Sequence, residues 1–357
     1  MTAEPIASTA MAAEIREIPA VVAAQIDDRS AVAAAAGAIR RDQPEWVSLV
    51  ARGTSDHAAT YGRYLLEASL GLPAHLAAPS LTTVYHAPRR WDGGLVVAVS
   101  QSGRGPDVVE VVDAARRGGA LTVAIVNDAS SPLAAAAEHV IPCGAGTERA
   151  VAATKTYVAE LAALSLLAAA LVPEAPFALA LDRLPRVLER CLERATSWLA
   201  ASDAVSAIAG ARRCLVASRG YNQATALEVA LKLKETAGVF AEGYSTADLI
   251  HGPIALAGAD VPAVVFRPDG PIGARIDEGS ARAEAAGSPT WTIGGREVGT
   301  RAAVARARVL ALPLDVPEEL TPMALVLPGQ LLAEAAALAR GRDPDAPANL
   351  TKITMTR

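Results

Sequence analysis

Aromatic residues and cysteines are scarce in this chain of 357 residues. Phe, Trp and Tyr together make up 4% of the sequence, and the three cysteines are Cys143, Cys191 and Cys214. An odd number of widely spaced cysteines argues against a disulfide framework and against a zinc site, and is typical of a reducing compartment. We therefore expect a cytoplasmic protein without a zinc site.

The chain also lacks an excess of basic charge and an apolar run of membrane length. Its formal net charge is -5, and no stripe of Lys and Arg follows a predicted helix, so we expect no nucleic-acid partner. The longest apolar run, residues 161–172, is far shorter than the ~20 residues that a membrane span needs. Residues 1–19 do not have the pattern of a signal peptide. A small-molecule ligand and no membrane partner are expected.

What the sequence does contain is apolar content sufficient for a large core. Hydrophobic residues make up 52% of the chain, and its length favours two α/β domains over one. We predict a helical lead-in over residues 1–40, with Pro19 near a helix start, domains over 41–190 and 191–342, and an irregular tail over 343–357.

Two stretches of the first half have the order strand, tight turn, helix. The apolar run 46–51 ends in the turn 52–55, and the run 95–99 ends in the turn 100–105. Such units predict a parallel sheet that binds ligands beyond the carboxyl ends of its strands. Residues 215–220 repeat the pattern of residues 49–53, which indicates a duplicated domain.

The two turns carry hydroxyl groups beside predicted helix N-termini. Ser100, Gln101 and Ser102 lie in one turn, and Thr54 and Ser55 lie in the other. Unpaired N–H groups and the helix dipole favour an anion at such positions, although an isolated Ser or Thr there more often only caps the helix. Two adjacent hydroxyl-bearing turns favour a phosphate site. Neither matches a nucleotide-binding motif.

A charged face is predicted on the helix that begins near residue 227. Glu228, Lys232 and Glu235 are spaced by four and three residues, so on an α-helix they share one face among otherwise apolar positions. Buried charges need partners or a task. The alternative is an ordinary ion pair on a solvated helix. Likewise, His251 and Lys352 taken alone are compatible with a turn residue and a solvated tail lysine.

Six strings in order carry a resemblance to a known family. They are GTS (53–55), SQSG (100–103), AGTERAVAATK (145–155), LEVALKLKE (227–235), LIHGP (249–253) and DPDAPANLTK (343–352). They resemble the duplicated sugar-isomerase (SIS) domains in the isomerase half of glucosamine-6-phosphate synthase and in stand-alone glucosamine-6-phosphate deaminases. The resemblance spans nearly the whole chain. It implies two tandem SIS domains, each a parallel five-stranded, doubly wound, flavodoxin-like sheet flanked by helices.

The resemblance also implies roles for individual residues. It places around a sugar phosphate the side chains of Thr54, Ser55, Ser100, Gln101 and Ser102. Glu235 would move a proton between C1 and C2 of the sugar, with Lys232 and Glu228 beside it. His251 corresponds to the histidine that opens the pyranose ring and reaches the neighbouring subunit's site, which implies a homodimer. Lys352 corresponds to the lysine that closes over the substrate. The implied chemistry requires no metal or cofactor.

Three features depart from the family pattern. The chain begins Met1-Thr2 and has no glutaminase half with a terminal nucleophilic cysteine, so glutamine is not expected to be its nitrogen source. Gly105 stands where the family has Thr or Ser, which removes a hydroxyl from the phosphate turn. Ala153 replaces a serine that contacts the sugar in the synthase. Both substitutions bear on which sugar fits.

The leading expectation is an enzyme that converts glucosamine 6-phosphate to fructose 6-phosphate and ammonia. The same base acting on N-acetylglucosamine 6-phosphate would instead eliminate the 3-hydroxyl, which would make the protein a dehydratase (lyase). Simple aldose–ketose isomerisation uses the same base and phosphate site. A non-catalytic sugar-phosphate sensor is the remaining alternative, but a sensor has no chemical need for Glu235, His251 and Lys352 together.

Overall fold

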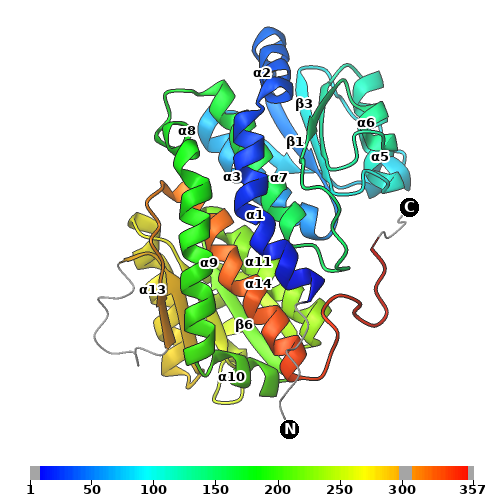
Figure 1. Ribbon diagram of the computed structural model, residues 1–357. Coiled ribbons are helices and arrows are strands. Elements are labelled where there is room, and N and C mark those ends of the chain that lie inside the picture. The colour runs from blue at the N-terminus through cyan, green and yellow to red at the C-terminus, as the bar shows by residue number, and fades with distance from the viewer. Residues whose placement is uncertain (1–8, 297–307, 353–357) are drawn as a thin grey trace.

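Two parallel sheets organise the fold (Figure 1). The computed structural model describes residues 9–296 and 308–352. The first sheet contains β1 (Trp46–Val50), β2 (Ala74–Leu76), β3 (Gly94–Ser100), β4 (Leu121–Val126) and β5 (His139–Pro142). The second contains β6 (Arg213–Ser218), β7 (Phe240–Ser245), β8 (Ala263–Arg267), β9 (Thr290–Gly294) and β10 (Val309–Ala311).

The two sheets share one strand order. The first runs β2-β1-β3-β4-β5, and the second, read from β7, runs β7-β6-β8-β9-β10. Every pairing is parallel. This is the flavodoxin-like order, which places ligand sites beyond the carboxyl ends of the first and third strands of a sheet. The predicted architecture of two five-stranded, doubly wound α/β units is therefore confirmed.

The helices surround and separate these sheets. They are α1 (Ala10–Asp27), α2 (Ser30–Asp42), α3 (Thr54–Leu70), α4 (Ser80–Thr83), α5 (Pro106–Arg117), α6 (Pro132–Ala136), α7 (Lys155–Leu171), α8 (Pro176–Ala180), α9 (Leu184–Ala201), α10 (Ala204–Gly210), α11 (Gln223–Lys232), α12 (Thr246–Ile250), α13 (Pro271–Ala285) and α14 (Thr321–Ala339). The predicted domain division after residue 190 lies within α9, which packs against α1 and α14 in the middle of the molecule (Figure 1).

Both faces of each sheet are covered, which explains why the central strands are continuously apolar. On β3, Leu95 and Val97 belong to the large core that extends through the middle of the molecule into the second half. Val96 and Ala98 point the other way and pack against α5 and α6. Helices α12 and α13 cover the outer face of the second sheet in the same manner.

The helix α14 is the most apolar long helix of this core. Within the described residues, the stretch Glu318–Ala339 has the length and composition of a membrane span, and 78% of its apolar window is buried inside the fold. Its side chains pack against α9, α10 and α11. The stretch therefore serves as a core helix in this structure.

The expectation that Pro19 lies near a helix start is wrong. Pro19 is buried in the interior of α1, which begins at Ala10 after Thr9. Thr9 caps the helix, because its hydroxyl accepts a hydrogen bond from the N–H of Ala12 at 3.0 Å. A proline inside a helix loses one backbone hydrogen bond. Here packing of the buried apolar face outweighs that cost.

The residues that follow α14 return to the first half of the molecule. The carboxylate of Asp345 accepts hydrogen bonds from the N–H groups of Ala10 and Met11 at 2.7 and 2.8 Å. The carbonyl of Asp345 accepts one from Val151 at 2.9 Å. The tail is thus irregular, as predicted, and is held by α1 and by the loop 145–154. The last part of the predicted tail, residues 353–357, lies outside the described residues.

Candidate functional site

A cavity of about 390 Å³ opens beyond the carboxyl ends of β1 and β3. Among the residues predicted for the site, those that line the cavity are Thr54, Ser55, Ser100, Gln101, Ser102, Glu235 and Lys352. Gly105 and Ala153, the two positions that depart from the family pattern, also line it. The fold therefore brings together turns of the first half, a carboxylate of the second half and the tail.

The turn after β1 is shaped by Gly53. Its φ is +56°, a left-handed conformation that glycine adopts without steric cost, and α3 begins at the next residue. Thr54 and Ser55 therefore occupy the first turn of a helix whose initial N–H groups lack intrahelical partners. This geometry favours an anion in the cavity.

The turn after β3 uses its hydroxyls in two ways. Ser100 Oγ accepts a hydrogen bond from the N–H of Gly103 at 3.1 Å, and Ser102 Oγ accepts one from Arg104 at 3.3 Å. The hydroxyls thus stabilise the turn, as the alternative interpretation expected. Because a hydroxyl that accepts still has its own proton to donate, the same groups remain able to bind an anion.

The charged face of the predicted helix is buried. Lys232 Nζ lies 2.5 Å from Glu235 Oε2, 3.3 Å from Glu228 Oε1 and 3.1 Å from Thr54 Oγ1. The side chains of Lys232 and Glu228 are 0% exposed, which rules out a solvated ion pair. Burial alone would lower the pKa of Lys232, but the two carboxylates outweigh burial and raise it. Lys232 is therefore a permanent cation.

The spacing predicted that Glu235 lies on a regular α-helix, and this prediction is wrong. The helix α11 ends at Lys232, and Leu233–Ala237 form a π-helical turn. π-Helical turns are rare in proteins overall, but those that occur are often found at functional sites. The side chain of Glu235 is 21% exposed, while its partner Lys232 is fully buried. The π-helical turn thus places the Glu235 carboxylate at the cavity, while its partner Lys232 stays buried.

Sequence reasoning missed His57, which extends the buried cluster. His57 Nδ1 lies 2.8 Å from Glu228 Oε2, and Thr54 Oγ1 donates to Glu228 Oε1 at 3.2 Å. Glu228 therefore contacts Lys232, Thr54 and His57 at once, which links α3 of the first half to α11 of the second. The only sequence signal was a histidine three residues after Thr54.

Further cavity residues that the sequence did not single out lie on α7 and beside Gly53. Thr156, Tyr157 and Glu160 of α7 line the cavity and are buried. Ser55 Oγ donates a hydrogen bond to Glu160 Oε1 at 2.7 Å. Arg52 also lines the cavity, is half-exposed, and donates through Nε to the buried carboxylate of Asp107 at 2.6 Å.

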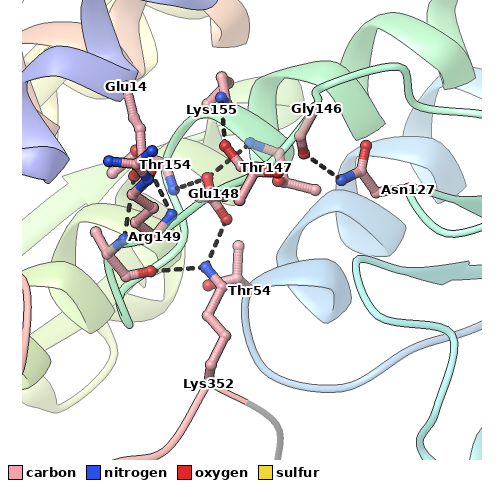
Figure 2. A network of polar contacts seen from close by, with 12 residues as sticks. Glu14, Thr54, Asn127, Gly146, Thr147, Glu148, Arg149, Thr154, Lys155 and Lys352 are labelled. Carbon is pink, nitrogen blue, oxygen red and sulfur yellow. Dashed lines mark hydrogen bonds and ion pairs between the residues drawn. The ribbon is translucent and has the colours of Figure 1, made fainter.

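The tail reaches the cavity through Lys352, which lines it and points toward Glu148 in Figure 2. Lys352 Nζ lies 2.8 Å from Glu148 Oε2 and 2.7 Å from the carbonyl oxygen of Ala150. Glu148 also accepts the N–H groups of Thr154 and Thr156 at 3.0 Å each. Burial would raise the pKa of Glu148, but Lys352 and these N–H groups lower it below its ordinary value. Lys352 is thus oriented by an ionised, buried carboxylate.

The loop that carries Glu148 is itself held from several sides. Lys155 Nζ lies 2.6 Å from Glu17 of α1 and 3.0 Å from the carbonyl of Thr147. Asn127 Nδ2 donates to the carbonyl of Gly146 at 2.8 Å, as Figure 2 shows. The loop 145–154 is therefore a fixed wall of the cavity.

Three predicted site residues do not line this cavity: Glu228 and Lys232, which are buried behind Glu235, and His251. His251 is exposed, follows α12 and is not among the residues that line the cavity of its own chain. Its role in the site of a neighbouring subunit stays a prediction. Within one chain, the cavity combines hydroxyl donors, Arg52, Lys352 and the Glu235 carboxylate.

The chain matches a known protein family and curated relatives. The sequence model of the SIS domain matches residues 43–170 and 207–271. The glutamine–fructose-6-phosphate aminotransferase (isomerizing) of Methanothermobacter thermautotrophicus is 35% identical over 310 residues, which cover 86% of this chain and 51% of that protein. This chain thus spans about half the length of that curated relative.

Two solved structures resemble the chain over nearly all of its length. A candidate phosphosugar isomerase from Silicibacter pomeroyi DSS-3 is 36% identical, with a TM-score of 0.83 over 95% of this chain and 100% of that one. A glucosamine-6-phosphate deaminase from Thermotoga maritima is 18% identical, with a TM-score of 0.78 over 98% of this chain and 100% of that one. The second likeness is one of fold.

Proposed function

Because this chain belongs to the SIS domain family, we propose that it is an enzyme that processes an amino-sugar 6-phosphate in the cavity between its two halves. The reaction we favour converts glucosamine 6-phosphate and water to fructose 6-phosphate and ammonia. The observation that carries the proposal is the Glu235 carboxylate, which faces two hydroxyl-bearing turns and is held at 2.5 Å by the buried cation Lys232.

The phosphate end of the substrate would lie at the turns after β1 and β3. The N-terminus of α3 and the hydroxyls of Ser100 and Ser102 supply neutral donors there, and the Ser55 hydroxyl would contact the phosphate from the first turn of α3. The Thr54 hydroxyl lines the same cavity but already donates to Glu228. Arg52 adds a cation at the same edge. Arg52 pairs with Asp107, two residues after Gly105, and lines the same cavity, so it could offset the hydroxyl that this chain lacks at Gly105.

The reacting end of the sugar would face Glu235. After ring opening, Glu235 removes the proton from C2 of the open-chain amino aldehyde and returns it to C1, which leaves an imine at C2. Water adds to that imine, and ammonia leaves. One positioned carboxylate is sufficient for both proton transfers, and nearby cations stabilise the charge that develops on the O1 oxygen. Lys352 is a cation that lines the cavity, and Lys232 is buried behind Glu235, 2.5 Å from its carboxylate.

We infer in addition that the active form is a cytoplasmic homodimer. His251 is exposed and lies away from the cavity of its own chain, which supports a role in the site of a second copy. In that site it would move the proton that opens the pyranose ring. An imidazole suits this step, because its ordinary pKa lies near neutral pH.

A dehydratase is the second candidate, and Ala153 favours it. Its methyl group lines the cavity at a position where the resemblance leads one to expect a hydroxyl. An apolar wall is compatible with an acetylated nitrogen, which does not leave as ammonia. Loss of the C2 proton to Glu235 would then expel the 3-hydroxyl as water and form a C2–C3 double bond.

Product analysis separates these reactions. The purified protein is incubated with glucosamine 6-phosphate and, separately, with its N-acetyl derivative, and the products are followed by an ammonia assay and by ultraviolet absorption. We expect ammonia together with a ketose phosphate from the first substrate. An unsaturated product that absorbs in the ultraviolet, formed from the second substrate without ammonia, would establish the dehydratase instead.

The variant Glu235→Gln tests whether the protein is an enzyme at all. Replacing the base should lower kcat by about 10²- to 10⁴-fold, because a carboxamide does not accept the C2 proton. Binding of fructose 6-phosphate should persist. The matched control is Glu242→Gln, since Glu242 pairs with Lys234 away from the cavity. Unchanged turnover in Glu235→Gln would show that Glu235 is not the base. Binding of a hexosamine phosphate by the wild type without any turnover would leave a sugar-phosphate sensor as the better interpretation.

A further inference from the structure

Some residues that line the cavity carry polar atoms with no role in the proposed reaction. Within the described part of the chain, Thr156 Oγ1, Tyr157 Oη and Glu160 Oε2 are buried and have no hydrogen-bond partner. All three side chains belong to α7 and line the cavity. Buried polar atoms without partners are costly and uncommon in native proteins. Their clustering at the cavity indicates that their hydrogen bonds are completed when a ligand binds.

Glu160 is connected to the phosphate turn through a single hydroxyl. Ser55 Oγ donates its proton to Glu160 Oε1 at 2.7 Å, and both side chains line the cavity. A serine hydroxyl has one proton. While Glu160 takes that proton, Ser55 presents only lone pairs to a phosphate, which repel its oxygens. An ionised Glu160 behind Ser55 would repel the phosphate further.

We propose that Glu160 acts as a neutral carboxylic acid that donates its proton to Ser55 Oγ when phosphate binds, so that the Ser55 hydroxyl turns to donate to the phosphate. This inference rests on the proposed function, in which Ser55 contacts a sugar phosphate. Glu160 is then a positioning residue, because it acts through Ser55 and does not touch the reacting carbons. No covalent bond to carbon forms or breaks in this step.

The surroundings of Glu160 favour its neutral form. The charged groups that face it are the carboxylates of Glu148 and Glu228 and the ammonium of Lys232. The titratable groups beside it are Tyr157 and the thiol of Cys143, and burial raises the pKa of each well above its ordinary value. Two carboxylates oppose one cation. Burial, with these carboxylates, raises the pKa of Glu160 well above the usual range of a carboxyl group.

The proposal gives phosphate binding a pH dependence of known sign. At low pH Glu160 is neutral and Ser55 is free to donate. As the pH rises through the raised pKa of Glu160, the carboxylate recaptures the Ser55 proton, and affinity for phosphate falls. In Glu160→Gln the carboxamide N–H donates to Ser55 Oγ at every pH, so this fall should be absent. Any dependence that remains belongs to the phosphate itself or to other groups.

The experiment is calorimetric titration of the full chain with fructose 6-phosphate, and separately with inorganic phosphate, between pH 6 and 9. We expect Glu160→Gln to match the wild type on the acidic side of the wild-type transition and to bind about tenfold more tightly on its alkaline side, the size of one charge-assisted hydrogen bond. Glu160→Leu, which leaves Ser55 without a donor, should bind about tenfold more weakly than the wild type at pH 6. Ser165→Ala is the control on α7, because Ser165 bonds to Tyr61 and does not line the cavity.

Two results would overturn the inference while sparing the proposed function. One is a pH profile of Glu160→Gln that coincides with that of the wild type. The other is a Glu160→Leu variant, folded by circular dichroism, that binds fructose 6-phosphate as tightly as the wild type. If the wild type binds neither ligand at any pH, the phosphate site of the proposed function fails, and this inference fails with it.

Discussion

Individual residues at the cavity form two groups that differ in burial. Glu228 and Lys232 are fully buried, whereas Arg52 and Lys352 are half-exposed and partly exposed. A buried pair keeps its geometry because any other arrangement leaves a charge without solvation. An exposed cation can follow a ligand as it enters. We therefore expect the buried pair to set the position of Glu235 and the outer cations to set affinity.

Arg52→Ala tests the outer group. Losing the guanidinium should raise the KM for a sugar phosphate about tenfold and leave kcat within about threefold, because the proposed function places Arg52 at the phosphate end rather than at C1 and C2. Steady-state kinetics with hexosamine 6-phosphates measures both constants. Arg104→Ala is the matched control, since Arg104 pairs with Asp128 and is not a cavity residue. A fall in kcat with unchanged KM would contradict the assignment.

Some site residues were predictable and others were not, for a physical reason. Thr54, Ser55, Ser100 and Ser102 follow strands directly, so local strand–turn–helix order is sufficient to place them. The contacts of Glu160 with Ser55 and of His57 with Glu228 join residues more than one hundred positions apart. No local pattern encodes such contacts. Arg52 lies in a turn that the sequence predicts, but it has no hydroxyl, so the pattern did not indicate it as a phosphate ligand.

Elements differ from their predicted forms where packing outweighs local preference. The sequence 227–235 has regular α-helical spacing, yet α11 gives way to a π-helical turn at Leu233. The insertion of a wider turn is not signalled by residue type, because it depends on what the helix packs against. The sheets were better predicted, since continuous apolar strands and tight turns leave few alternatives.

The tail is an element whose contribution can be tested by Lys352→Ala. We expect kcat/KM to fall by roughly tenfold or more, because a cation is lost from the cavity, while the fold stays intact. The melting temperature should change by less than about 3 °C, since Lys352 adds no apolar core. Activity assays and thermal unfolding measure the two effects. A variant that does not fold, or one that turns over normally, would refute the role of the tail.

The 3₁₀ turn before α14, Glu318–Leu320, supplies a pH-dependent prediction. Burial and the neighbouring Glu319 raise the pKa of Glu318 to about 7. The unfolded state loses this proton near pH 4.5, so stability falls as pH rises from 4.5 to 7 and stays lower above 7. Glu318→Gln removes the cost. Its gain should be near zero at pH 4 and roughly 1–2 kcal/mol at pH 8, after allowance for partial exposure.

Urea unfolding of wild type and Glu318→Gln at both pH values measures this difference. Glu319→Gln is a partial control, because it removes only the neighbouring charge. A gain of equal size at pH 4 and pH 8 would show that the effect comes from packing or hydrogen bonding rather than from ionisation.

At the scale of the whole molecule, the two halves have the same strand order but carry different side chains in the turns that follow their first strands. The turn after β1 carries Thr54 and Ser55, whereas the equivalent turn after β6 reads Arg219, Gly220 and Tyr221. Gly53 and Gly220 both have a positive φ, of +56° and +65°. The two halves thus share a strand order and differ in the side chains of this turn. One half holds hydroxyl donors for an anion, and the other supplies Glu235.

The dimer prediction is tested by mixing two inactive variants. His251→Ala and Glu235→Gln should each have little activity alone. If His251 serves the partner's site, each mixed dimer has one site with both residues intact, and random pairing of refolded subunits should restore about a quarter of wild-type activity. Activity is measured after co-refolding at equal amounts. No recovery in verified mixed dimers would show that each site uses the histidine of its own chain, or none.

The attachment of Asp345 to the first residues of α1 has a consequence for synthesis of the chain. A ribosome releases the hydroxyl turns early, the Glu235 turn later, and the residues around Asp345 and Lys352 later still. Domains fold in the order of their emergence. The cavity therefore remains open on one side until residues 345–352 return to α1 and Glu148. A nascent chain that has already folded both sheets would still lack Lys352 in its cavity.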